Sequence, residues 1–301
     1  MKSTTVRRAA LSITVATALA GMAACSSPGS SGDAGDEAGG RSTARVSPLA
    51  ALRTAARSTD RAGSVRVRST TTLGPLMSLR ADGPLGWRDG VTGTLTITYT
   101  GGTMAHAMRR LGATSMEARY LPDAYYARMG DGFAERAGGR HWIRYAYDDL
   151  AGLGGGSGAQ LRDQMRDTTP NQAVRLLLAS ADARKVGEER VLGARAAHYA
   201  GTVDVARLAT RNSGLDADAL AGLKKRLTRA GVTSETVDIW VDDRDLLVKK
   251  VERAAMATGA TTQTVYYSDY GVKVPAQEPP TGDTADFPDL VRKPNGAERT
   301  S

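Results

Sequence analysis

The stretch that decides the fold is Val186-Gly187-Glu188-Glu189-Arg190-Val191-Leu192-Gly193-Ala194-Arg195-Ala196-Ala197-His198-Tyr199-Ala200-Gly201-Thr202-Val203-Asp204. Two strand-like runs meet at Leu192-Gly193, where glycine readily takes the positive φ that a tight reversal needs. In the second run Tyr199 and Val203 point to one side and His198 to the other, because side chains of a strand alternate with a period of two. The stretch therefore predicts a β-hairpin with one apolar face.

Alternating apolar residues continue on both sides of this hairpin. Residues 94–100 alternate without interruption, with a threonine at every second position, and residues 65–68 and 236–242 follow the same period. Further strand candidates are residues 79–87, with a break at Asp82-Gly83-Pro84, and residues 115–121, 125–129, 141–145, 246–256 and 261–270. Such a succession of short strands separated by turn residues predicts an antiparallel meander.

Helical spacing marks four other segments. The first begins at Ser47-Pro48, a capping residue followed by a proline in the first helical position. A short helix is predicted at residues 159–167, another from Thr169-Pro170 onward, and a fourth after the capping box Ser213-Gly214-Leu215-Asp216. The apolar stripes are Leu49, Leu52 and Ala56 in the first, Val174, Leu177, Leu178 and Ala181 in the third, and Leu220, Leu223 and Leu227 in the fourth.

The amino terminus has the pattern of an export signal. Lys2, Arg7 and Arg8 precede a short apolar run at residues 9–20, which is too brief to span a bilayer comfortably. The only cysteine, Cys25, follows directly after a run of small residues and precedes a polar stretch. This arrangement resembles a bacterial lipobox, in which the thiol receives a diacylglyceryl group and the signal is cut just before it.

The lipobox predicts a signal peptide at residues 1–24, a lipidated Cys25 and a flexible tether to residue 46. The protein would then lie outside the cytoplasm, anchored to the outer face of the cell membrane. The alternative is a plain secretory signal with a chance cysteine nearby. A single thiol in an exported protein cannot form an internal disulfide, which favours the lipobox.

Several segments together resemble the LolA-like lipoproteins of actinobacteria, the LppX/LprG group. The resemblance covers about residues 45–275 and rests on the order of elements and on His198-Tyr199-Ala200-Gly201-Thr202-Val203-Asp204, Ile239-Trp240-Val241-Asp242 and Tyr267-Ser268-Asp269-Tyr270-Gly271. It implies an α+β fold at residues 47–274, in which a strongly curved antiparallel sheet, a half-open β-barrel, has helices packed on its concave side. It also implies an apolar cavity for an acylated lipid or lipoglycan, without catalysis.

Two sets of site residues follow. The candidate cavity lining is Val65, Val67, Leu95, Ile97, Tyr99, Val237, Ile239 and Val241. The same residues could instead pack against the helices as a closed core, in a module that binds another envelope protein. Arg53, Arg57 and Arg61 recur every four residues on the first helix, either as a solvated face or as a patch that contacts anionic headgroups.

The remaining features exclude other classes of protein. The net charge of +8 includes the three basic residues of the signal, and aromatic residues make up only 5% of the chain, so a nucleic-acid partner is not expected. His106, His141 and His198 lack partners at metal-ligand spacing, and no nucleophile with a neighbouring base is evident. The sequence therefore predicts a monomer that is not an enzyme and has no metal or cofactor. Residues 275–301 are predicted to form a tail of low order with one short element at 287–291.

Overall fold

The computed structural model describes residues 47–110, 112–152, 169–208, 215–256, 259–275 and 277–292. The chain divides into two compact units, 1–44 and 45–301, and every described residue belongs to the second. The predicted signal peptide, Cys25, the tether and the predicted helix at 159–167 lie outside the described residues.

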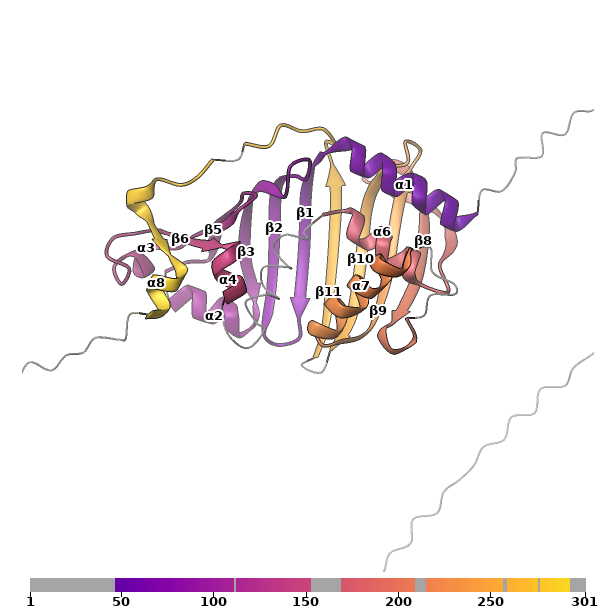
Figure 1. Cartoon of the computed structure of the whole chain (residues 1–301). Coiled ribbons are helices and arrows are strands. Elements are labelled where there is room, and N and C mark those ends of the chain that lie inside the picture. Colours follow the sequence, from indigo (N-terminus) through magenta and orange to yellow (C-terminus); the bar gives the residue numbers. More distant parts are fainter. Residues whose placement is uncertain are drawn as a thin grey trace, which may run out of the picture. The chain divides into compact units, whose positions relative to one another are not determined.

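In the described part of the chain, twelve strands form one sheet (Figure 1). The first meander contains β1 (Ser64–Leu73), β2 (Met77–Gly86), β3 (Thr92–Gly101), β4 (Ser115–Tyr120), β5 (Ala124–Arg128) and β6 (Trp142–Ala146). The second contains β7 (Arg184–Val191), β8 (Ala194–Asp204), β9 (Val232–Asp242), β10 (Leu247–Met256) and β11 (Gly259–Ser268). Strands β1 and β11 pair antiparallel, with Arg66 opposite Ser268, and so join the two meanders.

The sheet order is β12-β6-β5-β4-β3-β2-β1-β11-β10-β9-β8-β7. The predicted α+β class is confirmed, and the sheet is not closed into a barrel. The predicted antiparallel meander is present, and β12 (Thr284–Asp286), which the sequence did not predict, adds one parallel pairing, to β6. A parallel neighbour is possible here because a long connection, not a tight turn, precedes β12.

The predicted hairpin is present. Strands β7 and β8 pair antiparallel, and both turn residues have positive φ, 49° at Leu192 and 85° at Gly193. Two positive φ values in a two-residue turn match the right-handed twist of the flanking strands. On β8, Tyr199 and Val203 face the main core, whereas His198 lies on the other face and stacks on Trp240 of β9.

Strand β2 runs through the predicted break at Asp82-Gly83-Pro84 without interruption. Gly83 has a φ of +152°, and a Cβ at this position would lie 2.1 Å from the backbone oxygen of Thr94 on β3. Glycine therefore permits a close approach of two strands here, and the strand continues where the sequence pattern indicated a break.

Three helices lie over one face of the second meander (Figure 1): α1 (Pro48–Ala62), α6 (Asn171–Ala179) and α7 (Ala217–Arg229). The Oγ of Ser47 accepts a hydrogen bond from the amide of Ala50, as the predicted cap requires. The cap of α7 is Asp216, which accepts from the amide of Ala219 at 2.8 Å. We call this side of the sheet the helix-covered face.

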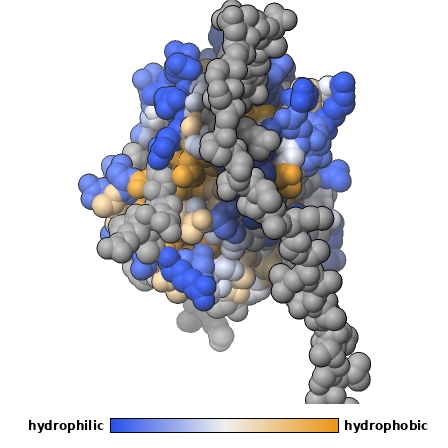
Figure 2. All heavy atoms as spheres, turned by 90° about the vertical axis from the view of Figure 1, so that its right-hand side faces the viewer, coloured by the Kyte–Doolittle hydropathy of each residue, from blue (hydrophilic) through white to orange (hydrophobic). Residues whose placement is uncertain are grey.

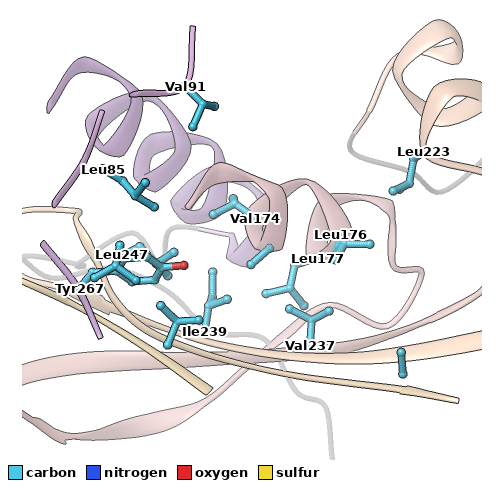
Figure 3. Packing of buried hydrophobic residues seen from close by; sticks show 14 of the residues in the cluster. Leu85, Val91, Val174, Leu176, Leu177, Leu223, Val237, Ile239, Leu247 and Tyr267 are labelled. Atoms are coloured by element: carbon cyan, nitrogen blue, oxygen red, sulfur yellow. The ribbon is translucent and has the colours of Figure 1, made fainter. Parts of the chain in front are cut away.

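The core lies between these helices and the sheet. In Figure 3, Val174 and Leu177 of α6 face Val237 and Ile239 of β9, and all four side chains are completely buried. Leu52 of α1 belongs to the same cluster. Burying a leucine or isoleucine stabilises a fold by roughly 1.5–3 kcal/mol, so this layer anchors α6 to the sheet.

The sequence did not predict several elements of the structure. These are α2 (Gly102–Arg110), α3 (Asp131–Ala134), α4 (Tyr147–Gly152), the short 3-10 helices η1 (Val205–Arg207) and η3 (Thr281–Asp283), and β12. The predicted low-order tail at 275–301 was wrong for residues 281–286, which contain η3 and β12, whereas the short element predicted at 287–291 is present as α8 (Phe287–Arg292). His141 Nδ1 lies 2.7 Å from Asp283 Oδ1, and the rings of Phe287 and Tyr145 are 4.8 Å apart, so this segment is held against β6.

Strand β7 forms one edge of the sheet and carries mostly exposed residues. Glu188 forms ion pairs with Lys185, at 2.6 Å, and with Arg195. Charged side chains on an edge strand oppose pairing with a second chain.

Figure 2 shows the right-hand side of Figure 1. Hydrophilic residues surround most of this side of the molecule, and hydrophobic residues lie nearer its middle. None of the described helices has the length and apolar character needed to cross a membrane.

Candidate functional site

A cavity of about 520 Å³ lies on the helix-covered face, between the sheet and helices α6 and α7. Alternate residues of β1, from Val67 to Leu73, line one side of it, together with residues of β2, β3, β9, β10 and β11. This volume falls within the range of small-molecule pockets, about 300–1,000 Å³. The apolar part of the lining includes Leu85, Leu95, Leu176, Leu227, Val265 and Tyr267.

The described helices cover only part of this face. Near the start of β1, Val65 is completely buried in the same cluster as Leu52 of α1. Near the end of the strand, Thr71 and Leu73 line the cavity and are only partly buried. The same face of β1 therefore belongs to the closed core near Val65 and to the cavity wall near Thr71 and Leu73.

Five charged residues also line the cavity: Glu235 on β9, Lys250 and Glu252 on β10, and Arg226 and Arg229 on α7. Lys250 Nζ lies 2.6 Å from Glu252 Oε2, and these side chains are only 10% and 12% exposed. A buried cation is tolerated when a carboxylate neutralises it, so Lys250 and Glu252 form a paired unit. Among the described residues, no hydrogen bond or ion pair joins the Glu235 carboxyl to a partner.

Burial and, to a smaller extent, the charge of Glu252 together raise the pKa of Glu235 from about 4.5 to about 7. Lys250 and Arg226 oppose this shift. Burial dominates because a carboxylate loses the solvation of its charge in an apolar site. The Glu235 carboxyl is therefore partly protonated near neutral pH.

The variant Glu235→Gln should lose part of the pH dependence of stability. The folded protein binds a proton at Glu235 over the range from about pH 4.5 to 7, where the unfolded chain has released it. The contribution of Glu235 to wild-type stability therefore falls as pH rises through this range. Urea unfolding at about pH 5 and about pH 8 should show Glu235→Gln gaining stability over wild type at the higher pH. An equal difference at both values would contradict this; the exposed Glu135→Gln is the control.

The structure places the predicted lining residues in two groups. Val67 and Leu95 line the cavity. Val65, Val237, Ile239 and Val241 are buried in the main core, and Ile97 packs against that core. The Tyr99 hydroxyl donates to Met116 Sδ at 3.4 Å. Six of the eight predicted residues are therefore not among those that line this cavity. The alternative, in which these residues pack as a closed core, describes Val65, Val237, Ile239 and Val241.

Sequence reasoning missed the polar part of the lining, which includes Ser69, Thr71, Gln263, Glu235, Lys250 and Glu252. The period of two contained a usable signal. Ser69 and Thr71 share a strand face with Val67, and Glu235 shares one with Val237, so each polar residue points to the helix-covered face. An apolar pattern alone would not select them.

The predicted basic residues lie together on α1. Arg53, Arg57 and Arg61 are all exposed. They lie on one side of the helix because residues four apart are neighbours on a helix surface. Arg57 donates to Thr54 Oγ1 at 3.1 Å and Arg61 to Ser58 Oγ at 3.2 Å. Leu52, by contrast, is fully buried. The arginines thus form a stripe away from the core.

Each histidine has a partner in the fold. His141 contacts Asp283, and His198 Nε2 lies 2.8 Å from Asp238 Oδ1 while its ring stacks on Trp240 at 4.3 Å. His106 lies 2.7 Å from Arg109 on α2. No group of three or more metal-ligating side chains occurs within the described ranges.

Comparison with known proteins gives two relatives with extensive identity. The Streptomyces coelicolor protein SCO4650, assigned by name to the lipoproteins, is 55% identical over 97% of this chain and 98% of its own length. This chain belongs to that lipoprotein family. A 31.2 kDa Streptomyces griseus protein encoded between rplA and rplJ, named as uncharacterized, is 51% identical over 83% of this chain and 82% of its own length. No family model matches the chain.

Matches among solved structures include LppX, LprF and a LolA superfamily protein, all at low sequence identity. Lipoprotein LppX from Mycobacterium tuberculosis has a TM-score of 0.46 and 14% identity, over 76% of this chain and 98% of that one. LprF from Mycobacterium bovis has a TM-score of 0.45 and 13% identity, over 77% and 96%. The LolA superfamily protein NE2245 from Nitrosomonas europaea has a TM-score of 0.27 and 9% identity, over 76% and 96%. The family assignment rests on the Streptomyces relatives.

Proposed function

We propose that this lipoprotein binds or carries an acylated lipid in the cavity on its helix-covered face, without catalysis. The observation that carries the proposal is the largely apolar cavity of about 520 Å³ beneath α6 and α7. An acyl chain of about sixteen carbons gains on the order of 12 kcal/mol on leaving water, at about 0.8 kcal/mol per methylene. Shape and an apolar lining are therefore sufficient for binding, and no reactive side chain is needed.

The same proposal places the protein outside the cytoplasm, attached to the outer face of the cell membrane through acylated Cys25. Two or more acyl chains on one residue give stable attachment, whereas a single chain gives only marginal attachment. The α1 arginines follow the tether in the chain and carry three positive charges on one exposed side. We assign them contact with anionic headgroups, which would tilt the domain toward the bilayer.

The variant Cys25→Ala should move the protein from the membrane fraction to the culture medium. Without the thiol there is no site for the diacylglyceryl group, and the arginine stripe alone gives weak, salt-dependent attraction. Immunoblotting of both fractions measures the effect. Membrane retention that disappears at high salt would assign the attachment to the stripe, and retention at high salt would contradict anchoring by Cys25.

Native mass spectrometry of the mature protein from its own host should reveal co-purified lipid. The variant Ala254→Phe should lose it, because Ala254 lines the cavity and a phenyl ring there would occupy the space of the acyl chain. The matched control is Ala255→Phe, one residue away on β10 and exposed. It should keep its lipid. A lipid-free wild-type mass would favour a protein-binding module with a closed core, and equal lipid content in both variants would place the lipid elsewhere.

A further inference from the structure

Two large apolar side chains are exposed on neighbouring segments at one end of the sheet. Leu76, in the turn between β1 and β2, is 48% exposed, and Met104, in the first turn of α2, is 37% exposed. The amide of Met104 donates to the backbone oxygen of Leu76 at 3.0 Å, and Thr103 Oγ1 donates to the same oxygen at 3.2 Å. The turn is therefore bound to the helix, and we call these two residues the Leu76–Met104 pair.

The cavity reaches the same end of the sheet. Leu73 and Met77 lie opposite each other where β1 turns into β2, and both line the cavity and are partly exposed. Thr261, opposite Leu73 on β11, and Met256, at the end of β10, also line it. Leu76 directly precedes Met77 in the chain. An exposed apolar side chain thus borders the cavity lining, whereas isolated apolar residues elsewhere on a surface carry no such meaning.

The exposed side of α2 carries positive charge and no acidic residue. Ala105 and Met108 are buried, and Arg109 and Arg110, in its last turn, are exposed. Arg109 contacts His106 Nδ1 at 2.7 Å. A short helix that combines an exposed apolar residue with arginines suits the surface of a bilayer, where the apolar group enters the acyl layer and the cations meet lipid phosphates.

We propose that the Leu76–Met104 pair contacts a bilayer leaflet and that the cavity is loaded from the leaflet at this point. The inference rests on the proposed lipid-binding function and adds the source and the route of the lipid. The pair inserts among the acyl chains while Arg109 and Arg110 contact phosphates. An acyl chain then passes to Met77 and Leu73 without full exposure to water, which is the unfavourable step for an apolar chain.

This contact is distinct from the one assigned to the α1 arginines. Figure 1 shows α1 at one end of the strands and the turn between β1 and β2 at the other. β1 has 10 residues, and a strand of that length spans roughly 33 Å. The two surfaces therefore serve different orientations of the domain on its predicted tether: α1 faces the bilayer at rest, and the Leu76–Met104 pair faces it during loading.

Transfer of a pyrene-labelled monoacylglycerol from vesicles tests the inference. The acceptor is the full mature chain carrying Cys25→Ala, and the donor vesicles are phosphatidylcholine, whose lack of net charge minimises attraction by the α1 arginines. With wild type, the transfer rate should rise with vesicle concentration, as transfer through contact requires. The double variant Leu76→Ser and Met104→Ser should slow transfer at least about tenfold, because it removes both inserted side chains.

The same probe supplied as dispersed monomers measures the cavity itself. Neither residue of the Leu76–Met104 pair lines the cavity, so the double variant should bind the monomers with an affinity within about twofold of wild type. The matched control is Leu192→Ser, in the turn between β7 and β8, where the side chain is 63% exposed. It should keep the wild-type transfer rate, and thermal unfolding would verify that all variants are folded.

A charge variant tests the role of the arginines. Arg109→Gln with Arg110→Gln should slow transfer from vesicles that contain phosphatidylglycerol and leave transfer from phosphatidylcholine nearly unchanged. Equal transfer rates in wild type and the Leu76/Met104 variant, or equal slowing by Leu192→Ser, would overturn this inference alone. A wild-type protein that does not bind the monomeric probe would overturn the proposed function as well.

Discussion

Replacing Leu177 by alanine is expected to lower the free energy of unfolding by about 3 kcal/mol. Leu177 is completely buried, and Figure 3 shows it between α6 and the Val237 and Ile239 side chains of β9. Truncation removes about three carbon atoms from a layer that also contains Val174, and a short helix cannot collapse fully into the gap. Urea unfolding followed by circular dichroism measures the change.

The control for this variant lies on the same helix. Arg175 is exposed, and Arg175→Ala should change the free energy of unfolding by less than about 0.5 kcal/mol. If both substitutions had similar small effects, α6 would not be a packed part of the core.

The variant Gly83→Ala is expected to cost about 3 kcal/mol, through backbone strain and steric overlap together. A Cβ at Gly83 would lie 2.1 Å from the Thr94 oxygen and 3.1 Å from Leu95 Cδ2. The first contact is with backbone, so relief requires β2 and β3 to separate in the interior of the sheet. The φ of +152° adds strain, because side chains with a Cβ rarely adopt it.

A glycine-to-alanine substitution on the edge strand β7 is the control. It measures the change in stability when a strand glycine is replaced without the steric overlap and backbone strain expected at Gly83. A Cβ at Gly187 would have no atom within 4 Å. Gly187→Ala should therefore alter stability by less than about 0.5 kcal/mol. Equal loss in both variants, measured by thermal unfolding, would show that the close β2–β3 approach is not what requires glycine.

Much of the fold could be predicted because its signals are local. The Leu192-Gly193 turn, the Ser47 cap and the uninterrupted alternation at 94–100 each require only neighbouring residues. β12 has only three residues and forms a strand only by pairing with β6. A segment this short is not long enough to show an alternation of apolar and polar residues. The continuation of β2 through Gly83 likewise depends on the approach of Thr94, which lies on another strand.

The candidate site was less predictable for a related reason. Alternation correctly placed Val65, Val67 and Leu95 on the inner side of the sheet, but it carries no information about where along a strand a helix will cover that side. Within the described residues, α1 and α6 pack in the same cluster as Val65, whereas Thr71 lines the cavity. Glu235 and Lys250 also line the cavity, where polar residues on the inner side can be tolerated.

The pairing of β1 with β11 has a consequence for how the protein matures. Arg66 and Ser268 are neighbours in space, yet nearly the whole domain is synthesised between them. The local hairpins can form as soon as they emerge, but the middle of the sheet must wait for β11, and closing such a long loop slows folding. Until that strand arrives, each meander presents an unpaired inner edge, so a chain released early is the form most prone to aggregate.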